Sequence, residues 1–192
     1  MNSARADEIA VALGRGEVVG IPTDTVYGIA ADPNSRTAVG RLFAIKGRAD
    51  SKPVGLLVAD LDTALDVVAL PGYALEWARL YWPGPLNLVA VSRSVLPEGV
   101  GDAGRGTVGV RVPDHLTTRA ILAAFGPLAV TSANRSGGPE TLDEAEARGA
   151  LGDLIDLYVP GRCPGAISST TVDVTGPKPV LLRKGPLDLG LD

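Results

Sequence analysis

The chain has 192 residues, 45% of them hydrophobic, and a formal net charge of −4, which suits one domain of residues 1–192 with a buried core. Only 4% of the residues are aromatic, and this scarcity, like the acidic balance, argues against a protein that stacks the bases of single-stranded nucleic acid. One cysteine and one histidine exclude an intramolecular disulfide and a zinc site of soft ligands, and they favour a reducing compartment.

The first predicted element is a helix over residues 4–13, with Ile9 and Leu13 on one face and Gly14 closing it. This amino-terminal stretch contains no apolar run of signal-peptide length, and no segment approaches the roughly 18 consecutive apolar residues that a membrane span requires. We therefore expect a soluble protein of the cytoplasm with no membrane partner.

Residues 17–53 are the segment around which the chain is organised. A β-branched run at 18–21 breaks at Pro22 into Thr-Asp-Thr, which predicts a polar loop at a strand end. Ser35 is the candidate N-cap of a helix that Gly47 ends. Four cations lie near the end of this helix or just beyond it: Arg41, Lys46, Arg48 and Lys52.

A helix carboxyl terminus favours one or two cations, because its last carbonyl groups are unpaired. Four within twelve residues of an acidic chain exceed this requirement, and they suggest a site for a polyanion such as a nucleoside triphosphate. From the residues alone, the four cations can be interpreted either as a solvated helix end or as a phosphate site. In either case Lys46 is expected to be exposed, so that its removal should cost little stability.

The rest of the chain alternates between short apolar runs and helical periodicity. Helices are predicted over 60–68, 73–81, 114–125 with Asp114 as N-cap, and after a capping box of Thr141 with Glu144. Strands are predicted over 54–58, 86–91, 107–112, 128–131, 155–159, 170–174 and 180–183. Several strands end in polar, glycine-rich loops, which indicates an α/β sheet whose loops converge on one crevice.

Residues 104–109 read Gly-Arg-Gly-Thr-Val-Gly and match the GxGxxG pattern. That dinucleotide fingerprint must follow a strand and open a helix. Here it opens a strand, so we reject it. Three valines at 108, 110 and 112 alternate with Thr107, Gly109 and Arg111, which predicts one core face and one polar face, with the Arg111 guanidinium projecting into the crevice.

A series of short motifs runs along the chain. They are Pro-Thr-Asp-Thr-Val-Tyr-Gly at 22–28, Lys-Gly-Arg at 46–48, Lys-Pro at 52–53, Trp-Pro-Gly-Pro-Leu at 82–86, Thr-Val-Gly-Val-Arg-Val-Pro at 107–113, Ser-Ala-Asn at 132–134 with Ser-Gly at 136–137, and Ser-Thr at 169–170 before Val-Asp at 172–173. In this order they resemble the YrdC family of threonylcarbamoyl-AMP synthases, over about residues 3–184. The resemblance implies a YrdC-like α/β domain, a twisted mixed β-sheet flanked by helices around a basic concave groove.

The resemblance also implies roles for residues of the groove. Lys46 and Arg48 would clamp the ATP phosphates and carry the catalysis, and the further ATP contacts would be Lys52, Ser132, Asn134 and Arg183. The threonine end would be lined by Thr23, Thr25, Thr107, Arg111, Ser169 and Thr170, and the Arg111 guanidinium would be a bidentate fork for the threonine carboxylate. Ser168 stands where the family often has Glu, so any role of that acid is absent or supplied elsewhere.

The same residues also have ordinary interpretations. Ser132 and Asn134 suit a turn, threonines are common in strands, and Arg183 suits a solvent-exposed strand end. A nucleophilic serine is disfavoured, because a triad needs a histidine base and the only histidine, His115, lies at a predicted helix start.

The implied activity is synthesis of L-threonylcarbamoyladenylate from L-threonine, ATP and bicarbonate or CO₂, with release of pyrophosphate, for t⁶A modification of tRNA. Mg²⁺ would be held mainly by the phosphates, with no metal ligand assigned to the protein. The product would pass to separate t⁶A transferase proteins. Two alternatives stay open: a paralogue that adenylates a different carbamate, and a double-stranded RNA or tRNA binding protein that uses the same groove, for which we expect only weak RNA binding.

Overall fold

The structure of the chain, a computed structural model, describes residues 3–47 and 53–191. Its helices are α1 (Ser3–Gly14), α2 (Arg36–Lys46), α3 (Leu61–Val67), α4 (Gly72–Tyr81), α5 (Leu116–Phe125), α6 (Glu144–Leu151) and the 3-10 turn η1 (Gly152–Leu154). Its strands are β1 (Val19–Ile21), β2 (Gly28–Ala31), β3 (Gly55–Leu57), β4 (Val68–Ala69), β5 (Leu86–Ser92), β6 (Thr107–Arg111), β7 (Leu128–Ser132), β8 (Leu157–Tyr158), β9 (Thr170–Asp173) and β10 (Val180–Arg183).

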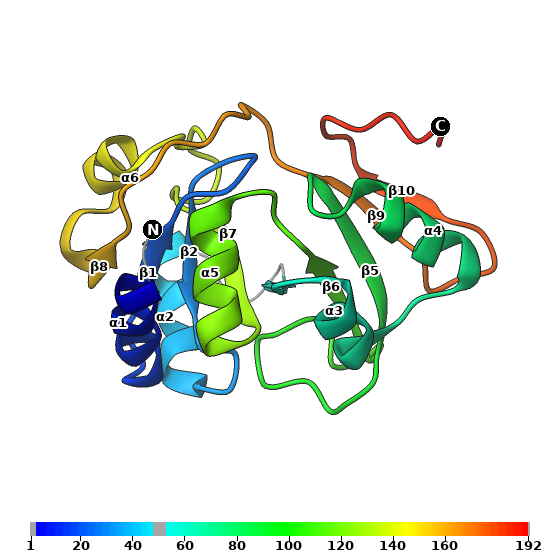
Figure 1. Cartoon of the computed structure of the whole chain (residues 1–192), viewed down its shortest axis with the longest axis horizontal. Helices are drawn as coiled ribbons and strands as arrows, with labels where there is room; N and C mark the ends of the chain where they lie inside the picture. Colours follow the sequence, from blue (N-terminus) through cyan, green and yellow to red (C-terminus); the bar gives the residue numbers. More distant parts are fainter. Residues whose placement is uncertain (1–2, 48–52, 192) are drawn as a thin grey trace.

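These strands form one sheet in the order β10-β9-β5-β6-β3-β7-β2-β1-β8, with β4 paired to β5. The pairs β5–β9, β3–β6 and β1–β8 are parallel, whereas pairs such as β5–β6 and β2–β7 are antiparallel. Helices flank the sheet along its length (Figure 1). The predicted α/β class, with a mixed sheet flanked by helices, is therefore confirmed.

Two apolar clusters lie on opposite faces of the strands β1 and β2. On one face α1 packs through Ile9 and Leu13, which are four residues apart and so lie on one side of the helix, and α5 packs through Ile121 and Leu122. On the other face α2 contributes Ala38, Val39, Leu42 and Ile45. The face that carries α1 and α5 continues across the sheet onto β3, β6, β5 and β9, and the candidate site lies there.

The ends of α2 match the prediction. The Ser35 hydroxyl accepts a hydrogen bond from the Ala38 N–H (3.2 Å), and Gly47 closes the helix at φ 64°, a left-handed conformation that glycine adopts without steric cost. Lys46 is consequently held as the last residue of a capped helix, with its side chain directed by a rigid element.

Two predicted caps are wrong. The N-cap of α5 is His115, with no side-chain cap bond, and the Asp114 N–H instead donates to Asp24 Oδ1 (3.0 Å). The capping box of α6 is shifted by two residues: Asp143 accepts from the Glu146 N–H (2.9 Å), and Glu146 Oε2 accepts from the Leu142 N–H (2.8 Å). Asp143 offers the same chemistry as Thr141, so the pattern alone does not fix the register.

Strand β2 is absent from the sequence-based prediction. Its residues, Gly-Ile-Ala-Ala, have weak strand propensity, yet all four are buried between β1 and β7. Tertiary pairing thus decides the conformation of this segment. None of the helices in the described ranges is long and apolar enough to cross a membrane.

Candidate active site

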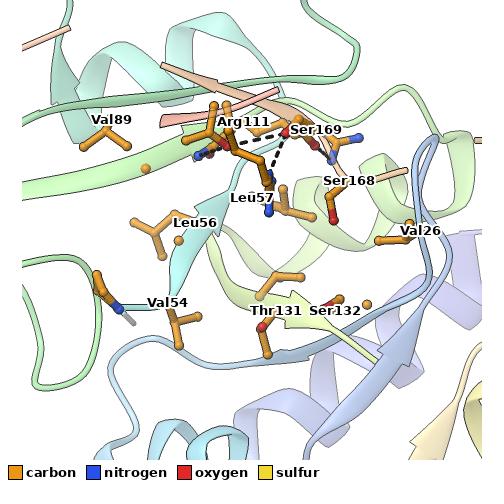
Figure 2. A pocket seen from close by; sticks show the side chains of 18 of the residues that line it. Val26, Val54, Leu56, Leu57, Val89, Arg111, Thr131, Ser132, Ser168 and Ser169 are labelled. Atoms are coloured by element: carbon orange, nitrogen blue, oxygen red, sulfur yellow. Dashed lines mark hydrogen bonds between the residues drawn. The ribbon is translucent and has the colours of Figure 1, made fainter. Parts of the chain in front are cut away.

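One face of the sheet carries a groove with a volume of about 780 Å³. Its floor is built from alternate strand positions, namely Asn87, Val89, Thr107, Gly109, Arg111 and Thr171. Its walls come from the 23–28 loop, the end of α2, the 130–140 segment and residues 168–169. In Figure 2 Ser132 lies at one side of this pocket, and Arg111 and Ser169 lie at the opposite side. The groove therefore has two chemically distinct ends.

At the first end, Lys46 meets Ser132 and Asn134. Its Nζ donates to Ser132 O (2.9 Å), Ser132 Oγ (3.1 Å) and Asn134 Oδ1 (2.5 Å). Asn134 Nδ2 donates in turn to Gly138 O (2.7 Å). The structure thus brings together three of the predicted ATP-binding residues, and these three acceptors of the ammonium group are neutral.

The expectation that Lys46 is exposed is wrong, because the residue is only 3% exposed. The helix end faces the sheet, so the ammonium group exchanges water for protein acceptors. The predicted clamp residues Arg48 and Lys52 lie outside the described residues.

At the second end, the Arg111 guanidinium is bound from within the protein. Its Nε donates to Gly84 O (2.9 Å), and its Nη1 donates to Thr25 Oγ1 (2.9 Å) and to Ser169 Oγ. Its Nη2 forms an ion pair with Asp24 Oδ1. Burial lowers the pKa of Arg111, and the Asp24 carboxylate opposes this shift.

The alternation predicted for β6 is confirmed, since Arg111 lines the groove, whereas Val108 and Val110 are buried in the core. The expected free fork is not observed. Four of the five guanidinium N–H groups already have acceptors, so Arg111 orders the hydroxyls of Thr25 and Ser169 at the groove surface and cannot offer two parallel donors to another carboxylate.

Thr23, Thr25, Thr107 and Ser169 all line the groove. The hydroxyls of Thr23 and Thr25 are 3.1 Å apart, and Thr23 Oγ1 donates to Val26 O (2.7 Å). These bonds fix the orientation of the loop that follows β1. The residues predicted for the threonine end therefore lie together in the groove, apart from one.

That residue is Thr170, whose hydroxyl donates to Leu187 O (3.1 Å) on the side away from the groove. Thr171 lines the groove instead. Successive residues of a strand point to opposite faces, so within β9 Thr171 faces the groove and Thr170 points to the other side. Arg183 does line the groove, and its Nε donates to Ser169 O (2.9 Å).

Other polar residues of the groove were not predicted as site residues. Asn87 is the one polar position on the groove face of β5. A single polar residue among the apolar ones of this strand could have identified it as a site residue. Asp102 and Arg105 come from the 99–106 loop, and Arg105 pairs with Asp173 (2.9 Å). Glu140 accepts a hydrogen bond from Ser168, and no sequence pattern placed these two side by side.

Two titratable groups lie close to Thr23 and Asp24, at the end of the groove that contains Arg111. Burial raises the pKa of the Cys163 thiol to about 11, and its sulfur accepts from the Thr23 N–H (3.2 Å). Burial lowers the pKa of His115, and the Asp24 carboxylate opposes this shift. In the parts of the chain that the structure describes, no three His, Cys, Asp or Glu side chains gather into a metal site.

The sequence and fold of the chain can be compared with those of known proteins. A relative from Mycobacterium leprae is 44% identical over 180 residues, which are 93% of this chain and 81% of that protein. Threonylcarbamoyl-AMP synthase from Halorhodospira halophila is 36% identical over 170 residues, covering 88% of each chain.

Solved structures of similar fold include Sua5 of Pyrococcus abyssi complexed with L-threonine, with a TM-score of 0.89 and 31% identity. The match covers 95% of this chain but 54% of the Sua5 chain, so this chain spans about half the length of that protein. Escherichia coli YciO has a TM-score of 0.89 and 25% identity, covering 98% and 92% of the two chains.

The family model of Sua5, YciO and YrdC, described as telomere recombination, matches residues 11–185. Together with the identities above, a match over nearly the whole length shows that the chain belongs to the Sua5/YciO/YrdC family.

Proposed function

We propose that this protein is a threonylcarbamoyl-AMP synthase, which forms L-threonylcarbamoyladenylate and pyrophosphate from L-threonine, ATP and bicarbonate or CO₂. The observation that carries the proposal is the two-ended groove. A cluster of Lys46, Ser132 and Asn134 faces a cluster of Thr25, Arg111 and Ser169 across one cavity. The names of the relatives support it, as does the L-threonine bound to P. abyssi Sua5.

The first cluster suits the nucleotide. The ammonium group of Lys46 lines the groove beside Ser132 and Asn134, which places a positive charge where phosphate oxygens can approach. Arg48, Lys52 and Arg183 would add further charge around the phosphates. The second cluster suits the amino acid, because hydroxyls ordered by Arg111 can bind its carboxylate and its side-chain hydroxyl. Thr23, Thr107 and Ser169 complete this end.

The reaction needs positioning and charge neutralisation more than a protein nucleophile. The threonine ammonium group first loses a proton, and the free amine then forms a bond to the carbon of CO₂ while one C=O π bond opens. Loss of a second proton from the nitrogen gives a carbamate. A carbamate oxygen then attacks the α-phosphorus, and the bond to the departing pyrophosphate breaks. Lys46 and Arg48 would stabilise the charge that develops on the phosphate oxygens.

Mg²⁺ would enter with ATP and take its ligands from phosphate oxygens and water, an arrangement that Mg²⁺ commonly adopts. The product would pass to the t⁶A transferase proteins in the cytoplasm. The acidic chain and its few aromatic residues favour this enzyme over an RNA-binding protein, for which only weak, salt-sensitive binding is expected.

The test is pyrophosphate release with ATP and bicarbonate, with and without L-threonine. Release that depends on L-threonine and yields threonylcarbamoyl-AMP supports the proposal. Release with another amino acid only would identify a paralogue. Submicromolar tRNA affinity at physiological salt, without threonine-dependent turnover, would favour the RNA-binding alternative.

A further inference from the structure

Glu140 places a carboxylate in the wall of a groove whose other charged lining residues are the cations Lys46, Arg105, Arg111 and Arg183 and one further acid, Asp102. Both Glu140 and Ser168 line the groove, and the Ser168 hydroxyl donates to Glu140 Oε1. Among the described residues, Glu140 Oε2 accepts no hydrogen bond and no cation lies within ion-pair distance of the carboxylate, although the charge of Glu140 acts on Arg183, where it opposes the lowering of the pKa by burial. Unlike Glu140, the carboxylates of Asp24 and Asp173 are already paired, with Arg111 and Arg105 respectively.

The position of this carboxylate is fixed from both ends of the groove. Ser168 precedes Ser169, which bonds Arg111 through its hydroxyl and Arg183 through its carbonyl, and Figure 2 shows Ser168 facing the pocket beside Ser169. On the other side, Glu140 follows the loop that Asn134 ties down through Gly138. The carboxylate therefore lies between the amino-acid cluster and the nucleotide cluster.

In the proposed reaction the atom that belongs between these two clusters is the α-nitrogen of the amino acid, because it becomes linked to the α-phosphate through one carboxyl group. At neutral pH this nitrogen is an ammonium group with three N–H donors and a positive charge. A carboxylate with one unused oxygen, already oriented by a serine hydroxyl, is its natural partner.

We propose that Glu140, oriented by Ser168, binds the α-ammonium group of the amino-acid substrate. This assignment rests on the proposed function and adds a residue to it. Ser168 stands where the family often has an acid. In this chain Glu140, which Ser168 contacts, would supply the carboxylate instead. The site therefore selects α-amino acids over acids that carry a hydroxyl in place of the amine.

The experiment titrates the purified full chain with L-threonine and with 2,3-dihydroxybutanoate of the same stereochemistry, which lacks the amine. Glu140→Gln keeps the shape and an acceptor for Ser168 but removes the charge. We expect it to weaken L-threonine binding about ten- to a hundredfold and to leave binding of the dihydroxy acid unchanged. Glu8→Gln, an exposed carboxylate of α1, is the matched control and should bind both as the wild type does.

Unchanged threonine affinity in Glu140→Gln, or an equal loss for both ligands, would overturn the assignment. A wild-type protein that binds no L-threonine would overturn the proposed function itself, and the two failures are thus distinguishable. A second variant guards against local misfolding: Glu140→Ser combined with Ser168→Glu returns a carboxylate to the same contact. The double variant should bind L-threonine at least tenfold more tightly than Glu140→Ser alone. A folded double variant that binds no more tightly would also count against the assignment.

Discussion

Asp24 and Arg111, 87 positions apart in the chain, form an ion pair in which the side chains are only 10% and 7% exposed. Asp24 Oδ1 also accepts the Asp114 N–H (3.0 Å), so one carboxylate joins the loop after β1, the groove face of β6 and the entry to α5. Because Arg111 in turn orders Thr25 and Ser169, this pair couples the stability of the fold to the shape of the amino-acid end.

Asp24→Asn should lower the free energy of unfolding by about 3 to 5 kcal/mol, because it leaves the buried Arg111 charge without its partner. Urea denaturation of the two proteins measures the difference. Glu98→Gln removes a partner of Arg36 in an ion pair whose side chains are 81% and 67% exposed, and it should change stability by less than about 1 kcal/mol. Equal losses in the two variants would contradict the structural role of the Asp24 pair.

Arg111→Lys should weaken L-threonine binding about ten- to a hundredfold, even though the charge is kept. A lysine has three donors on one nitrogen and cannot reach Gly84 O, Thr25 Oγ1, Ser169 Oγ and Asp24 together, so the hydroxyls lose their order. ATP affinity should change little, since the Lys46 cluster is untouched. Separate titrations with each ligand check this. If only ATP binding is lost, Arg111 acts at the nucleotide end and the prediction is wrong.

Lys46→Met should abolish pyrophosphate release and also destabilise the protein by about 2 to 4 kcal/mol, because Ser132 and Asn134 lose their donor inside the protein. Activity assays and denaturant unfolding measure the two effects. The control Lys178→Met alters an exposed lysine and should affect neither. An active Lys46→Met protein would refute the phosphate clamp.

The Cys163 thiol should make stability fall at alkaline pH. Its pKa in the folded state is raised to about 11, so the folded protein holds the proton longer than the unfolded chain does. The contribution of this group is complete below the ordinary thiol pKa near 9 and is lost as pH rises toward 11. Between these values the wild type should lose about 2 to 3 kcal/mol relative to Cys163→Ala. The free energy of unfolding of both proteins is measured at several pH values from 8 to 11. If it falls by the same amount in both, the thiol does not cause the loss of stability.

Local chemistry made part of this structure predictable. The valines of β6 alternate with polar residues, so the groove face of that strand and the inward position of Arg111 follow from a period of two. Ser35 and Gly47 likewise fixed the ends of α2. In both cases the residues that carry the signal are neighbours in the sequence.

The remainder depends on contacts between distant segments. Strand β2 exists because β1 and β7 enclose it, and Lys46 is buried because Ser132 and Asn134 meet the end of α2. Thr171 lines the groove and Thr170 does not, a difference of phase between neighbouring strand residues that the resemblance alone does not indicate. The contact of Glu140 with Ser168 had no local signal, since 28 positions separate them.

The pairing of β1 with β8 has a consequence for how this chain folds. Val19 lies opposite Leu157 in a parallel pair, and the Val18 N–H is bound by Asp156, 138 positions later (2.7 Å). A ribosome that makes the protein from its amino terminus therefore releases β1 long before the strand that completes its outer edge. Such high contact order slows folding, and the uncovered edge is open to wrong partners until residue 158 has emerged.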